Sequence, residues 1–219
     1  IVSGKEHFFI AHEKISCFAS PIINYDGKTI GIIDASTDSK SREQHTLALV
    51  KLATGDIAGA SAAWGEFKFG AGRGSDSLFA VWIGTGIGGG LILNNTIWRG
   101  PLGTGGEFGM GICEHGDDPS CKVLEAFASR SGMQRILHNP GLDTNAIKYG
   151  YGRDEAITTV VNAGAKLIGT SLANVITLLS LDKVVLGGGL VEALGETYTH
   201  TIREQFLKDV FPAHCQQCE

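Results

Sequence analysis

Two glycine runs and one carboxylate are the residues of this sequence best suited to chemistry. The first run extends from Gly84 to Gly90 (GTGIGGG), where glycine lets backbone N–H groups face a phosphate without an intervening Cβ. The same run equally suits a tight hairpin that needs positive φ. The second run, Gly187-Gly188-Gly189, suits either close approach of a ligand to the backbone or a helix-packing turn. Glu107 lies in a glycine-flanked loop, where its carboxylate faces either ligand hydroxyls or solvent.

Metal-binding residues are few and irregularly spaced. Cys113, His115 and Cys121 are residue types that zinc accepts, but their C-x-H-x5-C spacing is not one of the common structural zinc patterns. Cys215 and Cys218 form a C-x-x-C pair near the end of the chain, which either completes such a site or stands apart from it. We therefore expect no zinc and no protein-bound metal site.

The glycine runs follow apolar stretches that predict buried strands. LFAVWIG (78–84) predicts a strand that runs into a glycine turn, and LILNNTIW (91–98) predicts the strand that returns from it. KVVLGGGL (183–190) predicts a short buried strand that ends in three glycines. Apolar residues at helical spacing predict helices over 57–67, 122–137, 153–180 and 194–211.

Upstream of these elements, the sequence predicts a β-hairpin over 15–36 and an amphipathic helix over 42–53. The order of all the elements predicts an α/β fold. A doubly wound dinucleotide-binding unit is disfavoured, because neither glycine run follows the pattern strand, GxGxxG, helix.

The composition is that of a globular protein and narrows the classes of partner. Of the 219 residues, 43% are hydrophobic and 19% are charged, which is too apolar for a disordered chain. The formal net charge of −5 and the lack of a long basic run disfavour nucleic acid as a partner. We find no signal peptide and no apolar stretch that would span a membrane. Five cysteines predict free thiols and a cytoplasmic location.

Four ordered blocks resemble the ROK family of bacterial sugar kinases and related repressors. They are GTGIGGGLILNNTIWRG, LGTGGEFG, VLEAFASRSG and IGTSLANVITLLSLDKVVLGGGLVEALGE, within about residues 57–219. The resemblance implies an actin-like ATPase (ribonuclease H-like) lobe that binds ATP, Mg²⁺ and a sugar. It implies that Glu107 binds sugar hydroxyls and that two glycine sets bind the nucleotide: Gly84, Thr85, Gly86 and Gly88 at the phosphates, and Gly187, Gly188 and Gly189 at the adenosine.

The sequence also departs from the family pattern. The family's catalytic Asp, which takes the proton of the sugar hydroxyl, would stand eight residues before Glu66, where this chain has Ala58. Asp56 is the nearby carboxylate and our candidate for the base. Met110 stands where the family has a zinc-binding His, and Val123 stands where its last zinc-binding Cys would be. The family's opening phosphate loop, Asp-x-Gly-Gly-Thr, is missing. We therefore expect impaired catalysis.

The N-terminal part resembles a different family. About fifty residues, including CFASPI, DGKTIGIIDAS and HTLALV, resemble the last strands and closing helix of the GAF sensor domain of acetoin-type transcription activators. We therefore expect a small α+β GAF-like fragment over 1–54, followed by a ROK-type kinase region over 55–219.

These resemblances lead to one main functional expectation and two alternatives. The main one is an ATP-dependent hexose kinase of the ROK type, with a small-molecule sugar as its partner. The alternatives are a non-catalytic sugar-binding or transcription-regulating ROK protein and a GAF-like sensor fragment. The family resemblance also implies a homodimer.

Overall fold

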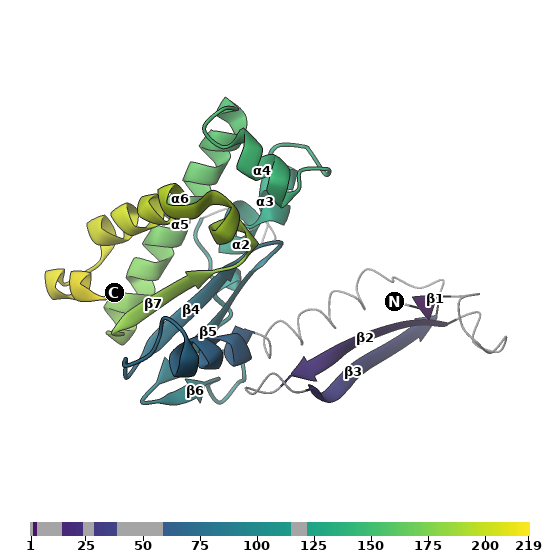
Figure 1. The fold of residues 1–219 in the computed structure, drawn as a ribbon, viewed down its shortest axis with the longest axis horizontal. Coiled ribbons are helices and arrows are strands. Elements are labelled where there is room, and N and C mark those ends of the chain that lie inside the picture. Colours follow the sequence, from purple (N-terminus) through teal and green to yellow (C-terminus); the bar gives the residue numbers. More distant parts are fainter. Residues whose placement is uncertain (1, 4–14, 24–28, 39–58, 115–121) are drawn as a thin grey trace.

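The computed structural model describes residues 2–3, 15–23, 29–38, 59–114 and 122–219, which form two sheets and a set of helices (Figure 1). The N-terminal sheet has the strand order β1-β2-β3 and the second sheet the order β6-β5-β4-β7. The strands are β1 (Val2–Ser3), β2 (Ile15–Ile23), β3 (Thr29–Asp38), β4 (Leu78–Ile83), β5 (Ile87–Leu93), β6 (Thr96–Trp98) and β7 (Lys183–Gly187).

One helix, over 59–69, precedes β4; the others lie either between β6 and β7 or after β7. They are η3 (Phe108–Met110), α2 (Leu124–Ala128), α3 (Arg130–Ile136), α4 (Thr144–Gly150), α5 (Glu155–Leu179), α6 (Gly189–Asp209) and η5 (Ala213–Gln217). Among the described residues, no helix is both long enough and apolar enough to cross a membrane.

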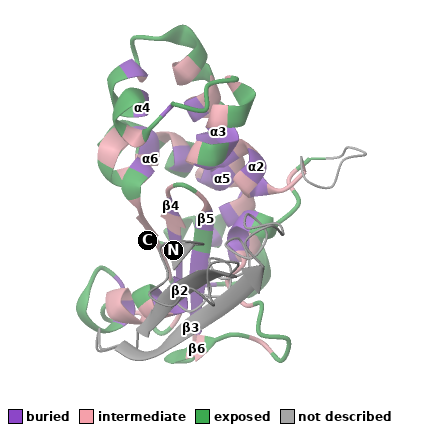
Figure 2. Ribbon diagram, turned by 90° about the vertical axis from the view of Figure 1, so that its right-hand side faces the viewer, coloured by how far each residue is buried: buried purple, intermediate pink, exposed green. Residues whose placement is uncertain are grey.

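The second sheet is covered by helices on both faces, as the apolar sequence of β4 predicts. Side chains alternate along a strand, so Phe79 and Val81 pack into the core that α5 and α6 complete, while Leu78 and Ala80 pack on the opposite face. There they meet Phe67 of the helix over 59–69. Figure 2 shows buried residues along β4, β5, α2 and α5. Burial on both faces explains why β4 is a nearly continuous apolar run.

The glycines of the first run divide between a turn and a strand, which corrects our prediction that the whole run forms the turn. β5 already begins at Ile87, so the turn consists of Gly84, Thr85 and Gly86 alone. Within β5, a Cβ on Gly89 would lie 2.6 Å from the carbonyl oxygen of Gly106, and one on Gly90 would lie 2.5 Å from the Cβ of Ala63. Glycine is therefore needed in β5 because other segments pack directly on its backbone.

The predicted helix over 122–137 is two short helices that meet at Ser129. This residue has an extended backbone (φ −83°, ψ 161°), and its buried hydroxyl accepts a 3.0 Å hydrogen bond from the backbone N–H of Gly132. Ser is a favoured N-cap residue, because its hydroxyl satisfies a free N–H of the first helical turn. The break directs the start of α3 toward the glycine turn.

The remaining predictions for the second sheet and its helices are largely confirmed. β4, β7 and the long helix α5 form where the sequence predicts them. The predicted returning strand divides into β5 and β6 at Asn94 and Asn95, which both have positive φ (50° and 60°), as a two-residue hairpin turn requires. Helix α6 begins at Gly189 instead of residue 194, with non-helical geometry inside it at Gly195.

In the N-terminal part, the two predicted strands are present. β2 and β3 pair as antiparallel neighbours, with Cys17 opposite Ser36. The hairpin turn at 25–28, the predicted helix over 42–53 and the predicted boundary at 54–55 lie outside the described residues. The GAF-like assignment of 1–54 therefore stays a prediction.

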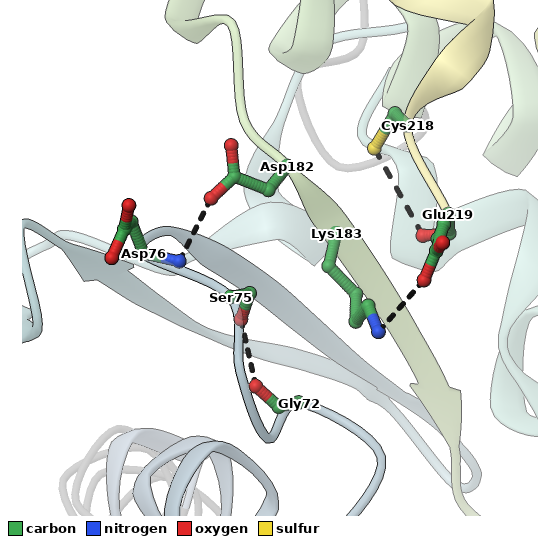
Figure 3. A network of polar contacts seen from close by, with 7 residues as sticks. All are labelled: Gly72, Ser75, Asp76, Asp182, Lys183, Cys218 and Glu219. Carbon is green, nitrogen blue, oxygen red and sulfur yellow. Dashed lines mark hydrogen bonds and ion pairs between the residues drawn. The ribbon is translucent and has the colours of Figure 1, made fainter.

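At their amino ends, β4 and β7 are joined by a network of polar contacts (Figure 3). The Asp182 carboxylate accepts hydrogen bonds from the backbone N–H groups of Asp76 (2.8 Å) and Ser77 (2.9 Å). In return, the backbone N–H of Asp182 donates to the Ser77 hydroxyl (2.9 Å). Beside them, the Lys183 ammonium contacts the Glu219 carboxylate at 2.9 Å. Each of these charged groups is bound to a protein partner.

Candidate functional site

The two glycine runs, about a hundred residues apart in sequence, meet at the carboxyl ends of β4 and β7. These strands are parallel, with Trp82 opposite Gly187, so both chains leave the sheet at the same edge (Figure 1). A Cβ on Gly84 would lie 3.9 Å from the backbone nitrogen of Gly189. In open α/β sheets, this edge is where ligands bind. The fold therefore unites the predicted nucleotide-binding residues on one surface.

Gly188 and Gly189 differ in what surrounds them. Gly188 has φ +95°, and a Cβ there would lie 2.6 Å from the carbonyl oxygen of Ile83, so this position admits only glycine. Gly189 is exposed, and a Cβ there would meet no heavy atom within 4 Å. It is the first residue of α6, whose opening backbone N–H groups carry partial positive charge. The fold thus requires Gly188, whereas Gly189 leaves open space above a helix start.

The turn over Gly84, Thr85 and Gly86 is held by the start of α3. The backbone N–H groups of Arg130 and Ser131 donate to the carbonyl oxygens of Gly84 (2.9 Å) and Thr85 (3.2 Å). The Arg130 guanidinium also donates to the Thr85 hydroxyl at 2.5 Å. Thr85 is exposed at the tip of the turn. Its hydroxyl therefore has a fixed position and a positive charge beside it.

Glu125 of α2 is the second charged group at this turn. Its carboxylate accepts a 2.7 Å hydrogen bond from the backbone N–H of Ile87, and a Cβ on Gly86 would lie 2.6 Å from the same oxygen. Gly86 therefore leaves room for a carboxylate that anchors the start of β5. Neither Glu125 nor Arg130 was among the site residues predicted from the sequence. The signal available was Ser129, a favoured helix N-cap in the middle of the predicted helix.

Glu107 immediately precedes η3, which packs on β5. The neighbouring Phe108 contacts Phe79 edge to face, with ring centroids 5.2 Å apart, and Gly109 lies against the backbone of Ile87. Glu107 itself is half-buried, and its backbone N–H donates to the carbonyl oxygen of Thr104 (3.3 Å). Ile87 is the first residue after the glycine turn. Its contact with Gly109 therefore places Glu107, the predicted sugar-binding residue, near that turn in the fold.

Other predicted site residues lie outside the described residues. These are Asp56, the candidate base, together with Ala58, His115 and Cys121. The Cys113 thiol is described and donates to the carbonyl oxygen of Lys122 (3.4 Å), and burial raises its pKa. In the described ranges, no group of three or more His, Cys, Asp or Glu side chains is placed to hold a metal ion.

A cavity of about 610 Å³ lies elsewhere, beside β7 and α6; Cys218 lines it, but none of the predicted nucleotide- or sugar-binding residues does. Its walls are largely apolar and include Leu172, Leu186 and Phe206. The glycine turns and Arg130 do not contribute to it, so it is separate from the candidate site.

The ROK family model matches residues 42–219. The chain belongs to the ROK family. The match covers both glycine runs, Glu107 and Arg130. The match begins at residue 42, whereas the sequence predicts that the kinase-like region begins at residue 55.

Individual ROK proteins show the same likeness. A glucokinase from Streptomyces coelicolor is 49% identical over 175 residues, which is 68% of this chain and 54% of that protein. The crystal structure of a ROK hexokinase from Thermus thermophilus superposes with a TM-score of 0.63 at 28% identity, covering 74% of this chain and 60% of the other.

A second structure, a ROK family glucokinase from Streptomyces griseus in complex with glucose and AMPPNP, has a TM-score of 0.60 at 20% identity and covers 91% of this chain and 88% of the other. This likeness shows the common fold. The present chain spans little more than half the length of the Streptomyces coelicolor enzyme.

Proposed function

We propose that this ROK chain binds Mg-ATP and a hexose and transfers the γ-phosphoryl group to a sugar hydroxyl. The observation that supports this most strongly is the meeting of two glycine segments at the carboxyl ends of β4 and β7. The turn from Gly84 to Gly86 offers backbone groups and the Thr85 hydroxyl to phosphates, while Gly189 leaves space for the rest of the nucleotide. The Streptomyces coelicolor and Thermus thermophilus relatives named above are a glucokinase and a ROK hexokinase, which agrees with the proposal.

The residues present fit a nucleotide. A Cβ at Gly84 would lie 3.9 Å from the backbone nitrogen of Gly189, and a Cβ at Gly189 would face open space, so both positions leave room for a ligand. The Arg130 guanidinium beside Thr85 supplies positive charge for phosphate oxygens. Mg²⁺ keeps several water ligands and binds mainly to substrate phosphates, so the nucleotide would hold it and it would supply charge neutralisation at the phosphates.

In this proposal Glu107 accepts hydrogen bonds from sugar hydroxyls, as an ionised carboxylate does. The attacking hydroxyl oxygen forms a bond to the γ-phosphorus while the bond between that phosphorus and the bridging oxygen breaks, leaving ADP. The hydroxyl proton passes to a carboxylate, for which Asp56 is our candidate. Because Ala58 stands where the family has its base, we expect turnover to be orders of magnitude below that of an intact kinase.

The test is sugar-dependent release of ADP by the purified chain, measured with a panel of hexoses. We expect slow release that depends on one sugar, an increase of roughly 10-fold or more in the variant carrying Ile57→Asn and Ala58→Asp, and loss of activity in Asp56→Asn. Turnover that Asp56→Asn leaves unchanged would remove Asp56 from the mechanism. If the double variant stays as slow as the original chain, the proposed kinase geometry is wrong.

A second candidate function is sugar binding without catalysis, and Ala58 at the position of the family's base favours it. A bound sugar stabilises the native state, so its signature is a melting temperature raised by a hexose with no release of ADP in any variant. Such a protein would act as a sugar-responsive regulator. A melt that responds to a non-sugar effector alone would instead favour the GAF-like sensor.

A further inference from the structure

Arg130 is the charged side chain at the glycine turn whose hydrogen-bonding capacity the protein leaves incompletely used. Its Nη2 atom donates to the Thr85 hydroxyl at 2.5 Å, and its backbone N–H donates to the Gly84 carbonyl oxygen. The Nε atom is buried, and in the described part of the chain it has no hydrogen-bond partner. A buried donor without a partner is destabilising, more so when the group is charged. Such a cost in a native structure requires an explanation.

Arg130 also has no ionic partner within the described ranges. Among the residues that the structure describes, no carboxylate forms an ion pair with it. Glu125, the acidic group at the same turn, accepts instead from the backbone N–H of Ile87. This partly buried guanidinium, beside an exposed hydroxyl and a glycine turn, is suited to bind an anion. Planar guanidinium groups can donate two parallel hydrogen bonds to phosphate oxygens.

We propose that Arg130 is a phosphate-sensing residue: it orients the Thr85 hydroxyl and donates hydrogen bonds to the terminal phosphates of the nucleotide, so that the site distinguishes a triphosphate from a monophosphate. The inference rests on the proposed nucleotide site and adds a residue and a selectivity to it. Because Nη2 already donates to Thr85 and Nε is enclosed by the protein, the Nη1 N–H groups are the ones assigned to the ligand. Arg130 is a cationic side chain at this turn, and we assign to it the side-chain part of phosphate recognition.

The experiment compares the affinities of AMPPNP and AMP, both with Mg²⁺, by isothermal titration calorimetry. In Arg130→Met we expect AMPPNP to bind roughly 10- to 100-fold more weakly, since hydrogen bonds to charged groups contribute that much, while AMP binding changes little. Arg130→Lys keeps the charge but not the planar fork, so we expect an intermediate loss for AMPPNP.

Arg135→Met is the matched control. Arg135 belongs to the same short helix and donates to the Ala126 carbonyl oxygen at 2.9 Å, so its removal takes one positive charge from α3 without touching the turn. We expect it to leave the ratio of AMPPNP to AMP affinity unchanged. A purely structural role of Arg130 would lower both affinities by one factor and leave that ratio unchanged.

Three results would overturn the inference. In the first, Arg130→Met leaves the affinity ratio at the wild-type value. In the second, Arg135→Met lowers that ratio as much as Arg130→Met does. The third applies if Arg130→Met does not melt cooperatively, so that Arg130→Lys is measured in its place. In that case, a wild-type ratio of AMPPNP to AMP affinity in Arg130→Lys overturns the inference. A wild-type chain that melts cooperatively but binds neither ligand would instead refute the proposed nucleotide site itself.

Discussion

The two ends of the β4–β7 strand pair are built on opposite principles. At the amino end, charged side chains bind protein groups. Asp182 accepts from the backbone N–H groups of Asp76 and Ser77, and Lys183 contacts Glu219; Figure 3 shows the contacts with Asp76 and Glu219. At the carboxyl end, glycine replaces side chains, and Arg130 keeps a donor without a partner among the described residues. The amino end is thus satisfied within the protein, while the carboxyl end has capacity for a ligand.

This difference shows how a fold separates stability from binding. Polar groups that are paired with each other stabilise a structure but have nothing left to offer a ligand. A site for an anion needs backbone and donor groups that are positioned and still available. Variants at the amino end should therefore change the free energy of unfolding, and variants at the carboxyl end should divide into those that break the fold and those that block the ligand.

The largest expected effect comes from Gly188→Ala. The new Cβ would lie 2.6 Å from the Ile83 carbonyl oxygen, at a residue with φ +95°. Strain at positive φ and forced displacement of the neighbouring strand each contribute 1–2 kcal/mol or more, so we expect a loss of about 3 kcal/mol in the free energy of unfolding. Urea denaturation measures this loss. A variant as stable as the wild type would show that the two strands do not meet at this point.

Gly189→Ala is the matched comparison, one residue further along the chain. Its Cβ would meet no atom within 4 Å, and alanine favours helices, so stability should be equal or slightly higher. The methyl group does enter the space assigned to the nucleotide, so we expect AMPPNP affinity to fall roughly 10-fold. Calorimetry and a thermal melt on the same sample test both statements. An unchanged affinity for AMPPNP would show that the nucleotide does not bind next to the start of α6.

At the amino end, Asp182→Ala removes the carboxylate that accepts from the backbone N–H groups of Asp76 and Ser77. The site is exposed, so water replaces part of the loss, and we expect about 1 kcal/mol of destabilisation by urea denaturation. AMPPNP affinity should stay at the wild-type value. A marked loss of nucleotide affinity in this stable variant would contradict the separation of the two ends.

The smallest effect should come from the ion pair between Lys183 and Glu219. The hydrogen bond from Lys183 lowers the pKa of the Glu219 carboxyl. Because this pKa is lowered in the folded state, the ion pair stabilises the fold fully at pH values above the ordinary carboxyl pKa. This stabilisation is lost as the pH falls through the lowered pKa of Glu219. Both groups are near solvent, so Lys183→Met should hardly change the melting temperature at pH 7. A large drop in melting temperature at pH 7, which persists at a pH where Glu219 is protonated, would require another role for Lys183.

Features fixed by local pattern were predictable from the sequence, and features fixed by packing were not. The apolar run of β4 and the helical spacing of α5 specify their elements directly. The glycines of β5 suggested a turn, because nothing local shows that Gly106 and Ala63 approach their backbone. Arg130 was missed because a charged residue within a helical pattern normally belongs to a solvated face.

The convergence of the two glycine runs was likewise beyond local reasoning. It depends on the parallel pairing of β4 with β7, strands that lie about a hundred residues apart in the chain. The family resemblance supplied the assignment that spacing alone left open. The break at Ser129 shows the opposite case, in which a local signal, a capping residue in a predicted helix, was present but outweighed by periodicity.

Hydrogen–deuterium exchange with and without Mg-AMPPNP tests the central claim most directly, because it reports on both ends of the strand pair at once. We predict that the nucleotide slows exchange of amides at 84–90, 129–132 and 187–191 and leaves those at 73–77 and 180–184 unchanged. Protection at the amino end without protection at the glycine runs, or no protection anywhere in a chain that melts cooperatively, would contradict the account.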